Sequence, residues 1–191
     1  MPASKLLLAG AVIVGATLVP TSGAPAAVTV IGSGLARICY EAAESGRATA
    51  DGFESCDRAL SEQALNVRDR AATFVNRGIL NMRERRISDA IADYERAIRL
   101  KSDLAEAYVN KGIALVHAGG RDSEAVNLIS RGLDLNPVRP EIAYYTRGVA
   151  NEALGRTRAA YDDYRQAAAL KPEWAEPKNQ LKRFSVVGKQ G

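Results

Sequence analysis

The sequence predicts an all-α protein made of stacked pairs of antiparallel helices, and two observations carry this prediction. The first is a repeat of 34 to 36 residues, whose register is marked by Gly78, Gly112 and Gly148. The second is the pattern after each glycine, in which an alanine is followed four residues later by a bulky residue. These pairs are Ala90 with Tyr94, Ala125 with Ile129, and Ala160 with Tyr164. A period of this length is typical of stacked units, none of which can bury its apolar face alone.

Each unit is predicted to contain two helices joined by a short turn. Ala90, Tyr94 and Ala97 recur with the spacing of one helical face. The small residues allow two helix axes to approach closely. Gly119 and Gly155 stand where a first helix should end in a left-handed residue. The second helices are predicted to begin at side-chain oxygen caps, namely Ser88, Asp122 and Thr157.

These features resemble the tetratricopeptide repeat, in which an aromatic residue, a small residue, an alanine–aromatic–alanine set and a proline follow one another. The aromatic positions are Phe74, Tyr108 and Tyr144. The resemblance covers three repeats, at 71–104, 105–140 and 141–174, and implies a right-handed superhelical solenoid with a concave groove. The chain departs from the family just before each glycine, where an apolar residue is usual. Here that position holds Arg77, Lys111 and Arg147.

Residues 1–26 have the features of a signal peptide. The basic start MPASK precedes 14 uncharged residues, and Ala24-Pro25-Ala26 supplies a small-x-small cleavage pattern. The alternative is an uncleaved anchor helix, which needs about 20 apolar residues, and Pro20 ends this run earlier. We therefore expect an exported chain without stable membrane insertion, located in the periplasm of a Gram-negative bacterium, with full secretion as the alternative. Residues 27–32 are expected to form a linker.

Two helical caps are predicted at the ends of the array. Residues 33–70 look like a degenerate helical pair, and Cys39 and Cys56 are expected to form a disulfide, because an exported chain favours pairing. A redox-active or metal-binding pair is not favoured, since the sequence has no CxxC and no histidine nearby. Residues 175–184 are predicted to form a capping helix, followed by a flexible tail at 185–191. Trp174, Leu181 and Phe184 are the residues expected to cover the last repeat.

The sequence carries little that suggests catalysis. Its single histidine, His117, has no neighbour at a spacing that would build a triad. Adjacent Asp162 and Asp163 point about 100° apart on a helix and do not share a site. The formal net charge of +4 is too mild to indicate nucleic-acid binding. We expect no enzyme activity, no cofactor and no metal.

The remaining candidate is the surface of the concave groove. Asn76, Asn110 and Thr146 lie two residues before the repeat glycines, where tetratricopeptide arrays often use asparagine amides to hold a peptide backbone. An equally weighted alternative is that these side chains bind only a neighbouring helix or water. The apolar residues expected beside them are Val75, Ile79, Val109, Ile113, Tyr145 and Val149.

The sequence therefore predicts a non-catalytic scaffold that binds an extended peptide or protein partner in this groove, as a monomer or weak oligomer. The alternative is a binder of a lipid or an apolar small molecule in the same groove, since both ligands would use the apolar floor. Asn76 and Asn110 favour a peptide ligand, because the backbone groups of a peptide must be hydrogen-bonded once they are buried. The third repeat departs from this pattern, since Thr146 stands at the same position.

Overall fold

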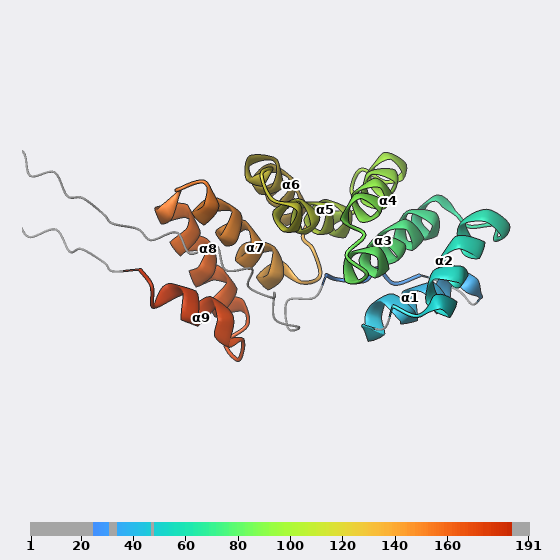
Figure 1. The fold of residues 1–191 in the computed structure, drawn as a ribbon, viewed down its shortest axis with the longest axis horizontal. Coiled ribbons are helices and arrows are strands. Elements are labelled where there is room, and N and C mark those ends of the chain that lie inside the picture. The colour runs from blue at the N-terminus through green and yellow to red at the C-terminus, as the bar shows by residue number, and fades with distance from the viewer. Residues whose placement is uncertain (1–24, 31–33, 47, 185–191) are drawn as a thin grey trace, which may run out of the picture.

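The computed structural model describes residues 25–30, 34–46 and 48–184. The predicted signal peptide up to residue 24, the end of the predicted linker and the predicted tail at 185–191 lie outside these residues. Over the described part of the chain there are nine helices and no strand, which confirms the predicted all-α class. Figure 1 shows the helices as an elongated row that begins with α1 and α2 and ends with α8 and α9.

The helices pair as predicted, and each pair packs on the next. The bounds of the N-terminal helices are α1 (Leu35–Ser45), α2 (Ala50–Glu62), α3 (Val67–Arg83) and α4 (Ile87–Leu100). Those of the C-terminal helices are α5 (Ala105–Ala118), α6 (Asp122–Asp134), α7 (Pro140–Ala153), α8 (Thr157–Leu170) and α9 (Ala175–Leu181). Helix α3 begins four residues before the predicted repeat boundary, because the side chain of Asn66 accepts a hydrogen bond from the Asp69 N–H at 2.8 Å and caps it.

The repeat glycines lie where the two helices of a pair touch. A Cβ atom on Gly78 would lie 2.5 Å from the ring of Tyr94, and one on Gly112 would lie 2.4 Å from Ile129. In the third pair, a Cβ atom on Gly148 would lie 2.8 Å from Tyr164. Contacts this short exclude any side chain, so the glycine and the bulky residue of each repeat specify one another.

The predicted caps of the second helices were wrong. Asp122 and Thr157 are the first residues of α6 and α8, and Ser88 is the second residue of α4. Their helices are preceded by arginines whose side chains make no cap hydrogen bond. In the first and third pairs a hydrogen bond closes a short turn between the helices. The N–H of Arg86 donates to the Asn81 carbonyl at 2.8 Å, and the N–H of Arg156 donates to the Asn151 carbonyl at 2.8 Å. The second helix therefore begins directly after the arginine, before the predicted cap could act.

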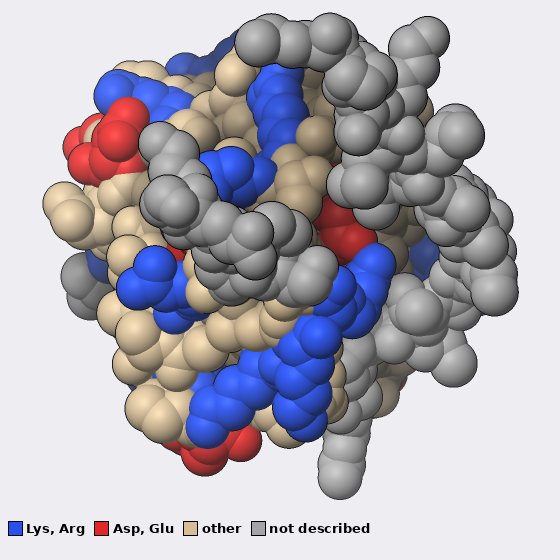
Figure 2. Space-filling view, turned by 90° about the vertical axis from the view of Figure 1, so that its left-hand side faces the viewer, with Lys and Arg blue, Asp and Glu red and all other residues tan. Residues whose placement is uncertain are grey.

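The two ends of the array are closed by different means. Cys39 and Cys56 form a disulfide between α1 and α2, with both side chains fully buried. At the other end the Trp174 ring packs 4.8 Å from Tyr145, and the Phe184 ring lies 5.7 Å from Tyr161. The outer face of this end carries exposed Lys and Arg side chains (Figure 2). No helix among the described residues is long and apolar enough to cross a membrane.

Candidate functional site: the concave groove

The groove of the first two repeats is occupied by the chain's own N-terminal segment, residues 25–30. Figure 1 shows this segment as a blue trace that runs beside α3 and α1. Val28 and Val30 are buried, with exposures of 7% and 3%, whereas Thr29 between them is exposed. This alternation is typical of an extended chain with one face against the protein. Within the predicted linker at 27–32, residues 27–30 pack against the array, because Val28 and Val30 join the apolar core.

Asn76 holds the backbone of this segment with both ends of its amide. Its Oδ1 accepts a hydrogen bond from the Val28 N–H at 2.8 Å, and its Nδ2 donates to the Val28 carbonyl at 2.8 Å. Asn76 has no exposed surface, so both bonds are shielded from water. One repeat later, Nδ2 of Asn110 donates to the carbonyl of Ala26 at 3.2 Å. The two asparagines make the kind of contact expected for a peptide-binding groove, and here the peptide belongs to the chain itself.

The apolar floor beneath the segment is continuous with the core. Val75 and Ile79 are fully buried in the same cluster as Val28 and Val30. Val109 and Ile113 belong to a second cluster, together with Ile142 and Trp174. The floor therefore stabilises the segment by burying Val28 and Val30.

The groove residues predicted for the third repeat are Tyr145, Thr146 and Val149, all on α7. The Tyr145 ring is 5.6 Å from Tyr164 and 4.8 Å from Trp174, which precedes α9. Thr146 is buried and Val149 is half-buried. The three predicted groove residues of this repeat thus belong to the part of the array that the C-terminal helix closes.

A small cavity lies where the segment meets the second repeat. Its volume is about 10 Å³, which suits one water molecule. Ala26, Glu106, Asn110 and Arg139 line it together with apolar side chains. Among the described residues, no group donates a hydrogen bond to Oδ1 of Asn110, although that atom is buried.

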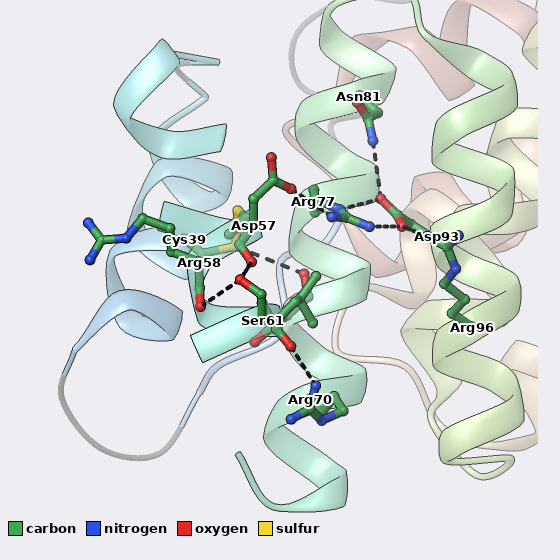
Figure 3. Close-up of polar contacts among 12 residues, drawn as sticks. Cys39, Asp57, Arg58, Ser61, Arg70, Arg77, Asn81, Asp93 and Arg96 are labelled. Atoms are coloured by element: carbon green, nitrogen blue, oxygen red, sulfur yellow. Dashed lines mark hydrogen bonds and ion pairs between the residues drawn. A yellow bond between two sulfur atoms is a disulfide. The ribbon is translucent and has the colours of Figure 1, made fainter. Parts of the chain in front are cut away.

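The three cations beside the repeat glycines point away from the groove, toward the second helices. Arg77 forms two hydrogen bonds with Asp93 of α4, at 2.6 and 2.9 Å, and one with Asp57 of α2 at 2.6 Å (Figure 3). Asn81 donates to the same Asp93 carboxylate at 3.1 Å. Arg77 therefore joins the N-terminal cap to the first repeat.

The same arrangement recurs in the later repeats with different chemistry. Arg147 pairs with Asp163 of α8 at 2.7 Å and donates to Ser130 of α6 at 3.0 Å. In the middle repeat, Nζ of Lys111 lies 3.0 Å from Glu95 of α4 and 3.6 Å from Glu124 of α6. Each cation thus connects its own second helix to that of the preceding pair. The sequence alone does not place these head groups, because their partners lie on other helices.

The described residues offer little for metal or acid–base chemistry. No group of three or more His, Cys, Asp or Glu side chains among them could hold a metal ion. His117 lies near the end of α5, where burial and the nearby Arg85 lower the pKa of its imidazole. Asp163 is engaged by Arg147 and Asn151, and Asp162 by Arg158, so this adjacent pair does not share a site.

Sequence reasoning missed the occupant of the groove. The signal that could have found it is Val28-Thr29-Val30, a short apolar–polar–apolar alternation of β-branched residues that favours extended chain over a linker. The alternation is only three residues long and follows a cleavage pattern, so it does not by itself predict a bound segment.

Comparison with known proteins agrees with this geometry. The sequence model of the tetratricopeptide repeat matches residues 142–173, which form α7, α8 and the turn after them. No curated protein matches the chain.

Several solved structures share the fold. The structure of MamA has a TM-score of 0.62 at 22% identity, over 75% of this chain and 80% of that one. The tetratricopeptide-repeat domain of OM64 from Arabidopsis has a TM-score of 0.58 at 24% identity, over 62% of this chain and 96% of that one. The first such domain of Spaghetti (RPAP3), bound to the HSP90 peptide SRMEEVD, has a TM-score of 0.57 at 22% identity, over 61% and 90%. Residues 142–173 thus match the tetratricopeptide repeat, and the described residues share the fold of solved tetratricopeptide-repeat domains.

Proposed function

We propose that this protein is an exported, non-catalytic scaffold that binds an extended peptide segment of a protein partner in its concave groove. The observation that carries the proposal is the reciprocal pair between the Asn76 amide and the Val28 backbone, at 2.8 Å in both directions. These bonds use only main-chain atoms of the bound segment. Any extended peptide in the same register could make them.

The occupant also indicates the chemistry of the ligand. Val28 and Val30 contact the groove and Thr29 faces outward, so the groove suits a segment with small or β-branched apolar residues at alternate positions. Peptide binding has a parallel among the structural relatives, since the RPAP3 domain is described with an HSP90 peptide. The groove here differs in that its own chain already fills part of it.

Because residues 25–30 of the chain already lie in the groove, they compete with a partner peptide and lower its apparent affinity. A peptide entering the groove must displace residues 25–30, so its apparent affinity falls by the fraction of molecules in which the segment has left. The partner therefore either has a better-matched sequence than the segment or binds when the segment is withdrawn. The alternative ligand, a lipid or apolar small molecule, gains no support from a cavity that has room for about one water molecule.

The proposal is tested with a labelled peptide that copies residues 24–31, titrated by fluorescence anisotropy. The Val28→Asp/Val30→Asp variant should bind this peptide at least tenfold more tightly than the parent chain. Burying two carboxylates against the apolar floor is costly, so the variant's own segment leaves the groove. Adding Asn76→Ala to this variant should weaken binding by about tenfold or more, since a buried peptide group loses its partner. Thr146→Ala in the same variant is the matched control and should leave the affinity unchanged.

Absence of binding to the opened groove, in a variant that remains helical by circular dichroism, would refute the proposal. Export is tested separately, by the mass of the protein recovered from the envelope fraction. A mass corresponding to a chain that begins at Ala27 is expected, and an uncleaved chain confined to the cytoplasm would contradict it. Pull-down from the same fraction then identifies the partner.

A further inference from the structure

The side-chain carbonyl of Asn110 is a buried acceptor beside a small cavity, with no donor among the described residues. Asn110 is 1% exposed, and no described group donates to its Oδ1. The atom adjoins the cavity beside Ala26. A buried acceptor without a donor is costly, so a group that donates there would be bound favourably.

The register of the segment brings the backbone that precedes Val28 next to this site. Asn76 holds Val28 through both its N–H and its carbonyl, which positions the preceding residue, Ala27, independently of what comes before it. The Ala27 nitrogen is bonded to the carbonyl carbon of Ala26, whose oxygen contacts Asn110 at 3.2 Å. Cleavage between Ala26 and Ala27 would remove that carbonyl, enlarge the cavity by the volume of Ala26, and leave an α-ammonium group beside Asn110.

The charges around the cavity suit a cation. Glu106 lies one helical turn before Asn110 on α5 and is 8% exposed. Its carboxylate accepts a hydrogen bond from the Val138 N–H at 3.1 Å and lines the cavity. The cation from the other wall, Arg139, is paired with Glu141 at 3.1 Å. These three charged groups carry one net negative charge, which an α-ammonium would neutralise.

We infer that this cavity binds the free N-terminus of an extended peptide, with Oδ1 of Asn110 and the Glu106 carboxylate as acceptors, and that the first such ligand is Ala27 of the processed chain. The inference rests on the proposed peptide groove and on the predicted cleavage site. It adds a rule for the ligand: the groove prefers a peptide whose first residue directly precedes the first of two alternate buried β-branched residues, as Ala27 precedes Val28 and Val30.

The first test compares the chain that begins at Ala27 with the same chain acetylated at its α-amino group. The acetyl carbonyl replaces that of Ala26, so it preserves the contact with Asn110 and removes only the charge. The free chain should melt at a higher temperature at pH 6.5. The pKa of the Ala27 amine, followed by NMR of a ¹⁵N label, should lie above about 9, against about 8 in an unfolded chain. Because the folded pKa is the higher one, the advantage is present below pH 8 and is lost as the pH rises through 9.

Two variants sharpen this test. Glu106→Gln should bring the pKa of the Ala27 amine below 8, because burial alone disfavours the ammonium form. Glu124→Gln removes a carboxylate that pairs with Lys111 and Arg121, away from the cavity, and should leave the pKa unchanged. Equal melting of the free and acetylated chains at pH 6.5, or an amine pKa of 8 or less in the parent, would overturn the site.

A peptide experiment separates this inference from the proposed function. Peptides copying residues 27–33, with a free or an acetylated amine, are titrated into the Val28→Asp/Val30→Asp variant. A tenfold preference for the free amine is expected. Equal binding of both peptides would overturn the N-terminus site and leave the peptide groove standing, whereas binding of neither would overturn both.

Discussion

The two ends of the groove are closed in different ways, and the residue two positions before each repeat glycine differs accordingly. In the first two repeats this residue is asparagine, and an extended segment lies against it through backbone hydrogen bonds. In the third repeat it is Thr146, next to Tyr145, whose ring packs against Trp174 ahead of α9. An extended chain must have its buried backbone groups satisfied from outside, whereas a helix satisfies its own. The two asparagines therefore lie in the part of the groove that holds the extended segment.

The middle repeat also differs from the first and third repeats on the face of the first helices that points away from the groove, where the cations beside the repeat glycines lie. The first and third repeats use arginine with a buried aspartate and an asparagine, as in Arg147, Asp163 and Asn151. In the middle repeat the aspartate and asparagine positions hold Leu128 and Leu115, which pack in an apolar cluster. Lys111 instead forms ion pairs with Glu95 and Glu124, whose side chains are each 40% exposed. A planar arginine pairs with two carboxylate oxygens at once, whereas lysine acts as a point charge between two partners.

The largest expected effect concerns the C-terminal end. Trp174→Ala should destabilise the protein by about 3–5 kcal/mol, because the ring is 3% exposed and packs on Tyr145. Hydrogen exchange should rise in α7 to α9 and stay unchanged in α1 to α3, since each repeat contacts only its neighbours. Trp174→Phe is the control and should cost less, as it keeps an aromatic ring and removes a buried indole N–H that has no acceptor among the described residues. Uniform exchange along the array would show that its two ends unfold together.

Removing the disulfide is the matching change at the N-terminal end. The Cys39→Ala/Cys56→Ala variant should lose about 3 kcal/mol, the value expected for a cross-link that spans 17 residues. Urea unfolding of the parent with and without reductant gives the same comparison without mutation. The helical content should survive, because the repeats bury most of the apolar surface. Collapse of all nine helices on reduction would contradict the independence of the two ends.

The roles of asparagine and threonine are compared by substitutions at the same position of the three repeats. Asn76→Ala should cost about 2 kcal/mol, because it leaves the buried N–H and carbonyl of Val28 without partners. Asn110→Ala should cost less in the uncleaved chain, since one hydrogen bond of 3.2 Å, to the Ala26 carbonyl, is lost. Thr146→Ala should be the mildest of the three. Equal losses measured by chemical denaturation would show that the asparagines do not act through the segment.

The smallest effect is expected at the middle repeat. Lys111→Met keeps the apolar stem and removes the charge, and it should change stability by less than about 1 kcal/mol, because both glutamate partners are half-exposed. Arg147→Met should cost more stability, because it leaves the buried carboxylate of Asp163 without its cationic partner. A salt titration sharpens this contrast: the Lys111 contribution should disappear in high salt, while that of Arg147 should largely persist.

Local pattern in the sequence was sufficient for the architecture. The period of the glycines, the alanine and aromatic positions and the left-handed Gly119 and Gly155 specify helix pairs, because each signal acts within one turn or one pair. The same pattern placed Asn76 and Asn110 on the groove face. The exact starts of the second helices were missed, since the hydrogen bond that sets them in the first pair joins Arg86 to Asn81 across the turn.

Only the tertiary structure decided what fills the groove and where the three cations point. Val28 meets Asn76 across 48 residues, and Ala26 meets Asn110 across 84. The partners of Arg77 lie on the helices before and after its own. No local periodicity links residues so far apart, because which of them meet depends on how successive helix pairs stack. The sequence by itself determined a surface that can hold a peptide backbone, and the stacking of the pairs placed the chain's own N-terminal segment on it.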